Sequence, residues 1–447
     1  MKELYQKYCG CSYRVTTDSR TIKGGEMFFA LRGDNFDGNA FALKALESGA
    51  AWAVVNSDAD LPDDERLIRV ADPYETLRDL AIWHRTHVRD GRLPVIGLTG
   101  TNGKTTTKNL IAAVLAKKFK VTATQGNLNN DIGVPLSLLS ITPDTEIAVI
   151  EMGANHPDDI EKLVRVSQPD YGLITNVGRA HLLGFGSFEG VIKTKCELYD
   201  FLRSRKDSLI FINADNEHLI DQISDDEEMW LSPYSTDPDN QYSCISGEVL
   251  ECNPFLKFRW REPLMVLEEE GRSTKWHKVQ TKLIGSYNID NLLAAIAVGI
   301  NFGVDRKKIV AALEAYEPSN NRSQMTVTEK NHLIVDAYNA NPSSMQAALE
   351  NFKIMQADNK MAILGAMREL GEVSAEEHQH VVDYLKTSDI KTVWLVGEEF
   401  EDTQCDFRKF KDVEEVKAAI AAEQPTGHYI LIKGSNSTKL YQLPELL

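Results

Sequence analysis

The sequence predicts an α/β protein of three domains built on largely parallel sheets. Three observations indicate this fold class. The chain has 447 residues, which at roughly 150 residues per domain corresponds to three domains. Short apolar segments alternate with segments of helical periodicity, which is typical of parallel strands covered by helices on both faces. Hydrophobic residues make up 43% and charged residues 26% of the chain, which excludes collagen-like, coiled-coil and largely disordered classes.

The first domain is expected at residues 1–92. Apolar runs at 27–31 and 51–55 have strand composition. Helical spacing is found at 41–49 and at 74–87, the second after the turn-prone pair Asp72-Pro73. A short polar stretch with Gly and Pro, residues 89–94, then predicts a domain boundary.

The second domain is expected at residues 93–316. An apolar strand at 95–99 enters a glycine-rich turn, and a helix follows from about Lys104 to Leu115. Residues 230–285 interrupt the alternation and predict a small β insertion of short strands and turns. The other expected strands are 146–151, 171–177 and 208–213, and the other expected helices are 157–166, 188–202, 291–302 and 305–315.

The third domain is expected at residues 317–447, after the polar boundary 317–321. Strand and helix patterns alternate again, which predicts a Rossmann-like α/β domain. The segment has no GxGxxG motif, so the sequence does not predict a dinucleotide site. The expected strands are 333–337, 361–365, 392–396 and 428–433.

Composition limits the location and the partners of the protein. A net charge of −17 argues against nucleic acid and anionic membranes as partners, because binding them requires clustered cations. No apolar run approaches the roughly 20 residues that a membrane helix needs. The N-terminal residues lack the apolar core of a signal peptide. The six cysteines lack zinc-site spacing and are expected to be reduced cytoplasmic thiols.

The strongest local motif lies between the strand at 95–99 and the following helix. Glycines there let backbone N–H groups surround phosphate oxygens, and the helix N-terminus adds a partial positive charge. We expect Lys104, on a solvent-facing loop, to reach terminal phosphates and Thr105 to ligate Mg²⁺. The strict P-loop has glycine where Leu98 stands, and the alternative is a turn that only caps a structural helix. The motif comprises Gly100, Thr101, Asn102, Gly103, Lys104, Thr105 and Thr106.

Other candidate residues are weaker when taken alone. Glu151 ends an apolar strand about fifty residues after the glycine-rich turn, a position from which an acid can hold Mg²⁺. His181 and Lys195 have no distinctive local pattern, so the ordinary interpretation is a packed or solvated side chain. His378 and His380 point to different sides of one helix, and we expect both at the surface.

Together these residues resemble the Mur ligase family of ATP-dependent amide-forming enzymes, over nearly the whole chain. Residues 126–135, GNLNNDIGVP, are similar to a segment of the family member that adds D-alanyl-D-alanine. The Asp-Asn-Pro-Arg signature of the sibling that adds diaminopimelate or lysine is missing. Ala366 stands where the family often has Asp. Further similar segments are 17–20, 28–38, 100–106, 151–156, 180–187, 338–342 and 433–435.

The resemblance implies a two-step reaction in peptidoglycan precursor synthesis that consumes ATP and uses Mg²⁺. A carboxylate of UDP-N-acetylmuramoyl-tripeptide takes the γ-phosphate of ATP, and the amine of D-Ala-D-Ala then displaces phosphate. Whether the tripeptide carries diaminopimelate or lysine stays open. We expect a monomer that closes its domains over the nucleotide.

The resemblance also implies roles for individual residues. Lys104 and Thr105 serve the phosphates and one Mg²⁺, while Glu151, His181 and a carbamylated Lys195 hold a second Mg²⁺. The remaining ATP contacts implied are Asn288, Asn291, Arg322 and Asp336. Ser19, Arg20, Asn129 and Asn130 are implied for the UDP-linked substrate, and Tyr338, Asn339 and Asn341 for the acceptor.

Three alternatives remain open at this stage. A Mur-type ligase could add a different amino acid or peptide. A phosphotransferase with the same loop would leave phosphate on its product. A non-catalytic protein gated by ATP would bind the nucleotide without turnover. Segments 126–135 and 338–342 disfavour the last two, because neither is needed to hold ATP alone.

Overall fold

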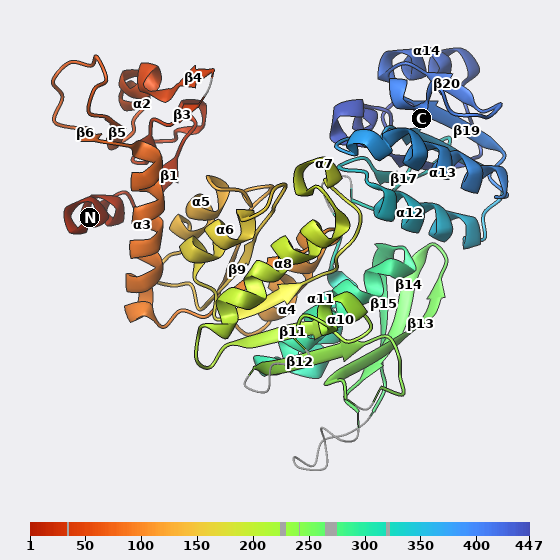
Figure 1. Ribbon diagram of the computed structural model, residues 1–447, viewed down its shortest axis with the longest axis horizontal. Coiled ribbons are helices and arrows are strands. Elements are labelled where there is room, and N and C mark those ends of the chain that lie inside the picture. Colours follow the sequence, from red (N-terminus) through yellow and green to blue (C-terminus); the bar gives the residue numbers. More distant parts are fainter. Residues whose placement is uncertain (34, 224–228, 241, 264–274, 319–321) are drawn as a thin grey trace.

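The computed structural model describes residues 1–33, 35–223, 229–240, 242–263, 275–318 and 322–447. Three sheet-containing bodies follow one another along the chain, from red through green to blue in Figure 1. The predicted α/β fold class is confirmed. Parts of three predicted segments lie outside the described residues: residue 34 of 28–38, residues 241 and 264–274 of 230–285, and residues 319–321 of the second boundary.

The N-terminal body is built on a parallel sheet with the strand order β1-β2-β5-β6. Its long helix α3 starts at a proline, with the Asp72 side chain accepting hydrogen bonds from two N–H groups of the first turn. The strands are β1 (Val15–Thr16), β2 (Met27–Phe29), β5 (Trp52–Asn56) and β6 (Leu67–Val70), with a hairpin of β3 (Arg32–Gly33) and β4 (Phe36–Asp37); the helices are α1 (Lys2–Gly10), α2 (Ala42–Glu47) and α3 (Pro73–His87).

A buried histidine joins α1 and α3 to the central body. His84 is fully buried; its Nδ1 lies 3.1 Å from the Tyr5 hydroxyl and its Nε2 lies 2.9 Å from the Ile141 carbonyl. The Ile141 carbonyl can only accept, so Nε2 carries the proton and Nδ1 accepts from Tyr5. Burial lowers the pKa of His84 to about 4.

The stability of this junction is expected to fall on acidification. Between pH 6.5 and 4 the unfolded imidazole binds a proton that the folded one excludes, so the free energy of unfolding drops by up to about 3 kcal/mol. We expect His84→Gln to lower the thermal midpoint at pH 7 and to flatten its decrease from pH 6.5 to 4.5. Equal pH slopes for wild type and His84→Gln would contradict this origin, and exposed His87 provides the matched control, His87→Gln.

The central body is built on one large sheet in the order β15-β14-β13-β12-β11-β10-β7-β9-β8. Neighbouring strands from β8 through β13 are parallel. Its strands are β7 (Val95–Thr99), β8 (Val121–Ala123), β9 (Ile147–Glu151), β10 (Tyr171–Ile174), β11 (Leu209–Asn213), β12 (Trp230–Ser235), β13 (Ile245–Cys252), β14 (Phe255–Arg261) and β15 (His277–Ile284).

Residues 230–285 form strands as predicted, but these strands extend the central sheet and do not form a separate insertion. β12 lies parallel to β11, and β13 to β12, after which β14 and β15 continue as antiparallel neighbours. Burial alternates along β14, whose buried side chains are Leu256, Phe258 and Trp260. Alternate residues of a strand point to the same face, and these three lie in the same core as α10. The alternation of strands and helices stops here because antiparallel strands follow one another without a helix between them.

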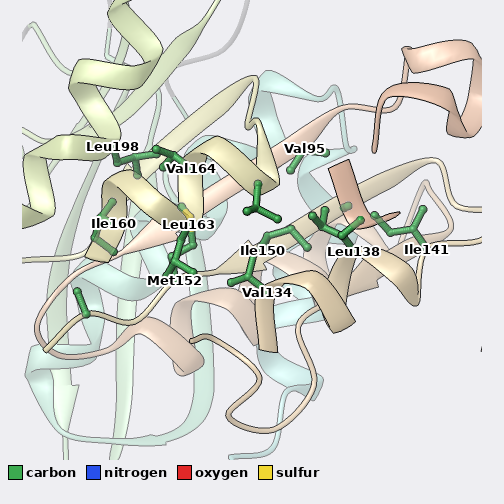
Figure 2. Packing of buried hydrophobic residues seen from close by; sticks show 14 of the residues in the cluster. Val95, Val134, Leu138, Ile141, Ile150, Met152, Ile160, Leu163, Val164 and Leu198 are labelled. Atoms are coloured by element: carbon green, nitrogen blue, oxygen red, sulfur yellow. The ribbon is translucent and has the colours of Figure 1, made fainter. Parts of the chain in front are cut away.

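Helices cover both faces of the central sheet. On one face α5, α6 and α8 bury side chains such as Leu138, Leu163 and Leu198 in one apolar cluster with Ile150 of β9 (Figure 2). The preceding residue of the strand, Val149, points to the opposite core with α4, α10 and α11. The helices are α4 (Lys104–Leu115), α5 (Gly133–Leu139), α6 (Asp159–Ser167), α7 (Leu182–Phe185), α8 (Phe188–Arg203), α9 (Glu217–Ile220), α10 (Ile289–Asn301) and α11 (Arg306–Ala315).

The C-terminal body has the strand order β16-β17-β21-β18-β19-β20, parallel except for β16. Among the residues that the structure describes, no helix has the length and apolar character of a membrane span. The strands are β16 (Gln324–Val327), β17 (His332–Asp336), β18 (Lys360–Gly365), β19 (Thr392–Val396), β20 (Arg408–Phe410) and β21 (Tyr429–Lys433); the helices are α12 (Pro342–Ile354), α13 (Ser374–Lys386) and α14 (Val413–Glu423).

Candidate active site

The glycine-rich turn lies between β7 and α4, at the carboxyl edge of the central sheet. Gly100 and Gly103 have φ angles of 142° and 78°, which residues with a Cβ rarely adopt. Space excludes side chains as well, since a Cβ on Gly100 would lie 2.0 Å from Thr175 Oγ1. The N–H of Asn102 donates to Asn176 Oδ1 over 3.0 Å, which ties the turn to the end of β10. The turn therefore has the rigid backbone that a phosphate cradle requires.

Lys104 is half-buried on the wall of the cavity and does not extend into solvent. Its Nζ donates to the carbonyls of Gly100 and Thr101, at 2.7 and 2.9 Å, so the side chain folds back over its own loop. Burial lowers the pKa of Lys104 to about 8, while the carboxylate of Glu151 acts in the opposite direction. The ammonium therefore lies within the loop, on the cavity wall where the phosphates of a nucleotide would be cradled.

Glu151 ends β9, the strand next to β7, and is 1% exposed. Its Oε1 accepts hydrogen bonds from Thr105 Oγ1 at 3.0 Å and from Asn129 Nδ2 at 2.8 Å. Its Oε2 is buried and has no hydrogen-bond partner among the residues that the structure describes. A carboxylate oxygen left open beside a phosphate-loop threonine is a suitable ligand for Mg²⁺, which prefers oxygen donors. The residues present therefore fit a magnesium ion.

Lys195 lies on α8 and is 2% exposed. Its Nζ donates to the carbonyl of Ala154 over 3.3 Å, and Ala154 itself lines the cavity. Burial, together with the positive charge of Lys104, lowers the pKa of Lys195 well below its usual range. The sequence alone suggested a solvated lysine, whereas Lys195 is buried in the structure. Its neutral amine form is therefore easier to reach than that of a lysine in water.

His181 precedes the short helix α7 and has a φ angle of 51°. Its Nδ1 contacts the Glu369 carboxylate of the C-terminal body, and the N–H of Leu183 lies 3.4 Å from the Glu369 carbonyl. Glu151 and His181 line the same cavity. Within the described parts of the chain, however, no hydrogen bond or ion pair joins Glu151, His181 and Lys195, and no cluster of three His, Cys, Asp or Glu side chains has metal-site geometry.

One cavity of about 1120 Å³ connects the three bodies. It runs from α3 across the phosphate loop to the strand ends of the C-terminal sheet. Gly100, Lys195, Ser19 and Arg20 are not part of its wall. The predicted residues on the wall are Thr101, Asn102, Gly103, Lys104, Thr105, Thr106, Asn129, Asn130, Glu151, His181, Asn288, Asn291, Arg322, Asp336, Tyr338, Asn339 and Asn341.

Asn291, supported by Asn288, connects α10 to the first turn of α4, directly after the phosphate loop. Asn291 Oδ1 accepts from Thr107 Oγ1 over 3.0 Å, and its Nδ2 donates to Asn288 Oδ1 over 2.9 Å. A Cβ on Gly103 would lie 2.6 Å from the Asn291 Oδ1. The two buried amides therefore tie α10 to α4, and Asn291 packs closely against Gly103 of the loop.

Asp336 and Lys433 face each other at the carboxyl edge of the C-terminal sheet. They occupy paired positions on the adjacent strands β17 and β21, and Lys433 Nζ donates to Asp336 Oδ2 over 2.5 Å. The Arg322 guanidinium lies 3.8 Å from the centre of the Tyr338 ring. Both pairs border the cavity opposite the phosphate loop.

The C-terminal body touches the phosphate loop directly. Asn341 caps the N-terminus of α12 and its Nδ2 donates to Asn102 Oδ1 over 2.9 Å. Ser343 of α12 also contacts the central body, since its Oγ accepts from the N–H of Arg179 over 3.2 Å. Asn341 and Asn102, 239 residues apart in the sequence, thus join the C-terminal body to the central one.

The N-terminal body contributes residues that the sequence analysis missed. Tyr74, Glu75 and Arg78 of α3 line the cavity. Arg78 follows Glu75 by three residues and Tyr74 by four, spacings that put it on one helix face with each of them. This signal exists in the sequence but does not say what the face meets. Arg20 instead forms an exposed ion pair with Asp18 at 2.7 Å, away from the cavity wall.

Comparison with known proteins follows this division of the chain. Residues 12–84 match the family model "Mur ligase family, catalytic domain", residues 98–299 "Mur ligase middle domain" and residues 321–436 "Mur ligase, glutamate ligase domain". An Escherichia coli K12 protein is 32% identical over 446 residues, which cover 97% of this chain and 93% of that protein. The chain belongs to the Mur ligase family. It is therefore a ligase by family.

The similar proteins of this family carry related names. The E. coli protein is called UDP-N-acetylmuramoyl-tripeptide–D-alanyl-D-alanine ligase, as is one from Bacillus subtilis strain 168 that is 30% identical, covering 96% of this chain and 92% of its own. A crystal structure described as MurF from Acinetobacter baumannii superimposes with a TM-score of 0.82 at 28% identity, covering 96% of this chain and 92% of that one.

The position where Mur ligases often have Asp is filled by the buried methyl group of Ala366. Glu399 provides a carboxylate nearby, because the Ala366 methyl and Glu399 Oε2 lie 2.7 and 3.0 Å from the point where a Cβ on Gly397 would stand. Glu399 Oε2 is buried and lacks a hydrogen-bond partner within the described residues. An acid is thus present beside this loop, although not at residue 366.

The expectation that His378 lies at the surface is wrong. His378 is fully buried, and its Nε2 accepts from the N–H of Met367 over 3.0 Å while its Nδ1 lies 2.7 Å from the Ser374 carbonyl. Its neighbour on the helix, His380, is exposed as expected. Both ring nitrogens of His378 are occupied by the backbone, so it holds the loop that carries Glu369 and is not a metal ligand here.

Proposed function

We propose that the protein joins D-alanyl-D-alanine to UDP-N-acetylmuramoyl-tripeptide, with hydrolysis of ATP to ADP and phosphate, in the synthesis of peptidoglycan precursors. The observation that carries this proposal is a phosphate loop with an open carboxylate oxygen, placed in a cavity that three bodies line. Relatives with this activity in their names match the chain over almost its full length, which supports the same substrates here.

The reaction needs activation because a carboxylate and an amine do not condense unaided in water. The tripeptide carboxylate attacks the γ-phosphate of ATP and forms an acyl phosphate, with ADP as leaving group. The amine of D-Ala-D-Ala then attacks the acyl carbon, and phosphate leaves. Both steps bring anions together, so cations at the reacting centre lower the barrier.

The chain's own residues supply most of this environment. The loop 100–106 binds the phosphates, and Lys104 neutralises charge that develops on the γ-phosphate. Thr105 and Glu151 would hold one Mg²⁺, and Glu151 with His181 and a carbamylated Lys195 would hold a second. When bound, Mg²⁺ supplies electrostatic stabilisation of the phosphates.

The remaining residues position the substrates. Asn288, Asn291, Arg322 and Asp336 border the nucleotide side of the cavity, and we assign them to ATP. We assign Tyr338, Asn339 and Asn341 to the acceptor, and Asn129 and Asn130 to the UDP-linked substrate. Ser19 and Arg20 would bind its uridine end, outside the cavity that holds the reacting groups.

Domain boundaries at 92/93 and 316/317 are part of the proposal. Each resulting segment contains one of the large sheets, and one chain encloses the whole cavity, so we propose a monomer that acts in the cytoplasm. The six cysteines are free thiols, which is compatible with a reducing compartment.

Arg20→Ala should raise the KM for the UDP-linked substrate about tenfold and leave the KM for ATP unchanged. Arg20 is exposed beside Asp18, so a ligand can reach its guanidinium, and the substitution would remove a charge-assisted contact to the nucleotide. Steady-state kinetics with each substrate varied in turn provide the measurement. Arg66, which forms an equivalent exposed pair with Asp64 at 2.6 Å, provides the matched control. Equal changes in both KM values would argue against a separate uridine site.

A phosphate-release assay tests the function as a whole. With ATP, Mg²⁺ and UDP-N-acetylmuramoyl-tripeptide, we expect sustained release of phosphate only when D-Ala-D-Ala is added. Single amino acids and other dipeptides serve as alternative acceptors, and tripeptides with diaminopimelate or lysine in third position are compared. Transfer of phosphate to a stable product without an amine would favour a phosphotransferase. Turnover with a different acceptor would identify another ligase of the family.

A further inference from the structure

A second lysine lies one helical turn below Lys104. Lys108 is on α4, 3% exposed, and does not belong to the cavity wall. Its Nζ donates a hydrogen bond to the Thr124 carbonyl over 2.6 Å. The same Nζ lies 4.0 Å from Oε2 of Glu151. This is the carboxylate oxygen that has no hydrogen-bond partner within the described residues.

Lys108, Thr124 and Glu151 form one buried unit. The N–H of Glu151 donates to Thr124 Oγ1 over 3.0 Å, and Thr124 is itself 1% exposed. The Thr124 carbonyl in turn accepts from the Lys108 ammonium, so Thr124 binds both the backbone of Glu151 and the lysine beside its carboxylate. These hydrogen bonds fix the position of the Glu151 backbone and the orientation of its carboxylate.

The two oxygens of Glu151 have different surroundings. Oε1 accepts from Thr105 and Asn129 and is fully occupied. Oε2 lies 4.0 Å from the ammonium of Lys108, which is too long for a hydrogen bond but short enough for electrostatic attraction in a buried site. A buried carboxylate without a compensating charge is costly. Lys108, which is not part of the cavity wall, supplies such a charge, and Oε2 accepts no hydrogen bond from the described residues.

We propose that Lys108 is a positioning residue for the ligation reaction, which holds the Glu151 carboxylate so that Oε2 stays available to a divalent cation bound with the nucleotide. This inference rests on the proposed function. It assigns Lys108 no contact with ATP, tripeptide or dipeptide. Lys108 acts through Glu151, and a purely structural lysine would instead affect only folding.

The test compares Lys108→Met with Lys117→Met, which removes an exposed lysine just after the same helix. Binding of a non-hydrolysable ATP analogue is followed by calorimetry at increasing Mg²⁺, without tripeptide or dipeptide. We expect Lys108→Met to need about tenfold more Mg²⁺ for half-maximal binding and to lose about tenfold or more in kcat, the range for residues that orient a metal ligand. The KM for D-Ala-D-Ala and the Lys117→Met variant should stay at wild-type values.

A double variant keeps the inference testable if Lys108→Met folds poorly. In the Glu151→Gln background the ammonium of Lys108 has lost its partner, so adding Lys108→Met should raise the thermal midpoint and change the Mg²⁺ requirement no further. A folded Lys108→Met protein with wild-type Mg²⁺ dependence would overturn the inference, as would additive effects in the double variant. Failure of the proposed function is distinct, because it would appear as absent turnover by the wild-type protein while its binding of the ATP analogue persists.

Discussion

Lys195→Ala is expected to reduce ligation to background, a loss of about 10³-fold or more if a metal ligand disappears. The claim behind this result is that Lys195 is carbamylated in the active enzyme. Carbamylation joins the neutral amine nitrogen to the carbon of CO₂ and releases a proton, so it needs a site that disfavours the ammonium. The structure provides that site, because Lys195 is 2% exposed and burial together with Lys104 lowers its pKa.

The carbamate has several measurable consequences. Activity should fall in CO₂-depleted buffer at mildly acidic pH and recover when bicarbonate is added, because acid converts the amine to the unreactive ammonium. A small carboxylic acid is expected to restore part of the activity of Lys195→Ala by filling the vacated ligand position.

Lys193 provides the control, since it lies two residues away on α8 and is exposed. Lys193→Ala should have almost no effect on ligation activity. Clear density for an unmodified Lys195 in a catalytically competent complex would rule the carbamate out, and so would a larger loss from Lys193→Ala than from Lys195→Ala.

Lys104→Ala is expected to lower kcat by about 10³-fold, equivalent to about 4 kcal/mol of transition-state stabilisation. The ammonium lies within the phosphate loop and is the cation nearest to the phosphates in the proposed reaction. The fold should persist, because the substitution removes two hydrogen bonds from Nζ to loop carbonyls, each worth about 1 kcal/mol.

The measurement pairs phosphate release with thermal unfolding of the same sample. Lys117→Ala, which removes an exposed lysine just after α4, should behave like wild type. Near-normal turnover by a folded Lys104→Ala protein would show that the loop is not the phosphate site. Loss of activity with loss of folding would instead assign Lys104 a structural role, and Lys104→Met, which keeps the volume of the side-chain stem, separates the two.

Much of the site could be predicted because its parts are local in sequence. A strand, two glycines with positive φ, and a helix that starts at Lys104 define the phosphate loop within a dozen residues. Parallel strands bring their carboxyl ends to one edge, so Glu151 had to lie near that loop once both strands were recognised. Asp336 and Lys433 end paired strands in the same way.

Other features depend on what each helix face meets. The face of α3 that carries Tyr74 and Arg78 looks like any amphipathic surface until it is placed against the cavity. His378 has the sequence setting of a surface histidine, but the loop at Met367 supplies a buried N–H for its ring. Strands β12–β15 read as an insertion because the alternation with helices stops, whereas their hydrogen bonds continue the central sheet.

By itself, therefore, the sequence determined the α/β class, the phosphate loop and the acid at the end of β9, because backbone conformation and strand direction follow from residues close in the chain. Only the tertiary structure decided that Lys104 turns back onto its loop, that Lys195 and Lys108 are buried, and that Asn341 touches Asn102. Charge and solvation depend on neighbours that folding brings from distant segments, and a local pattern carries no information about those neighbours.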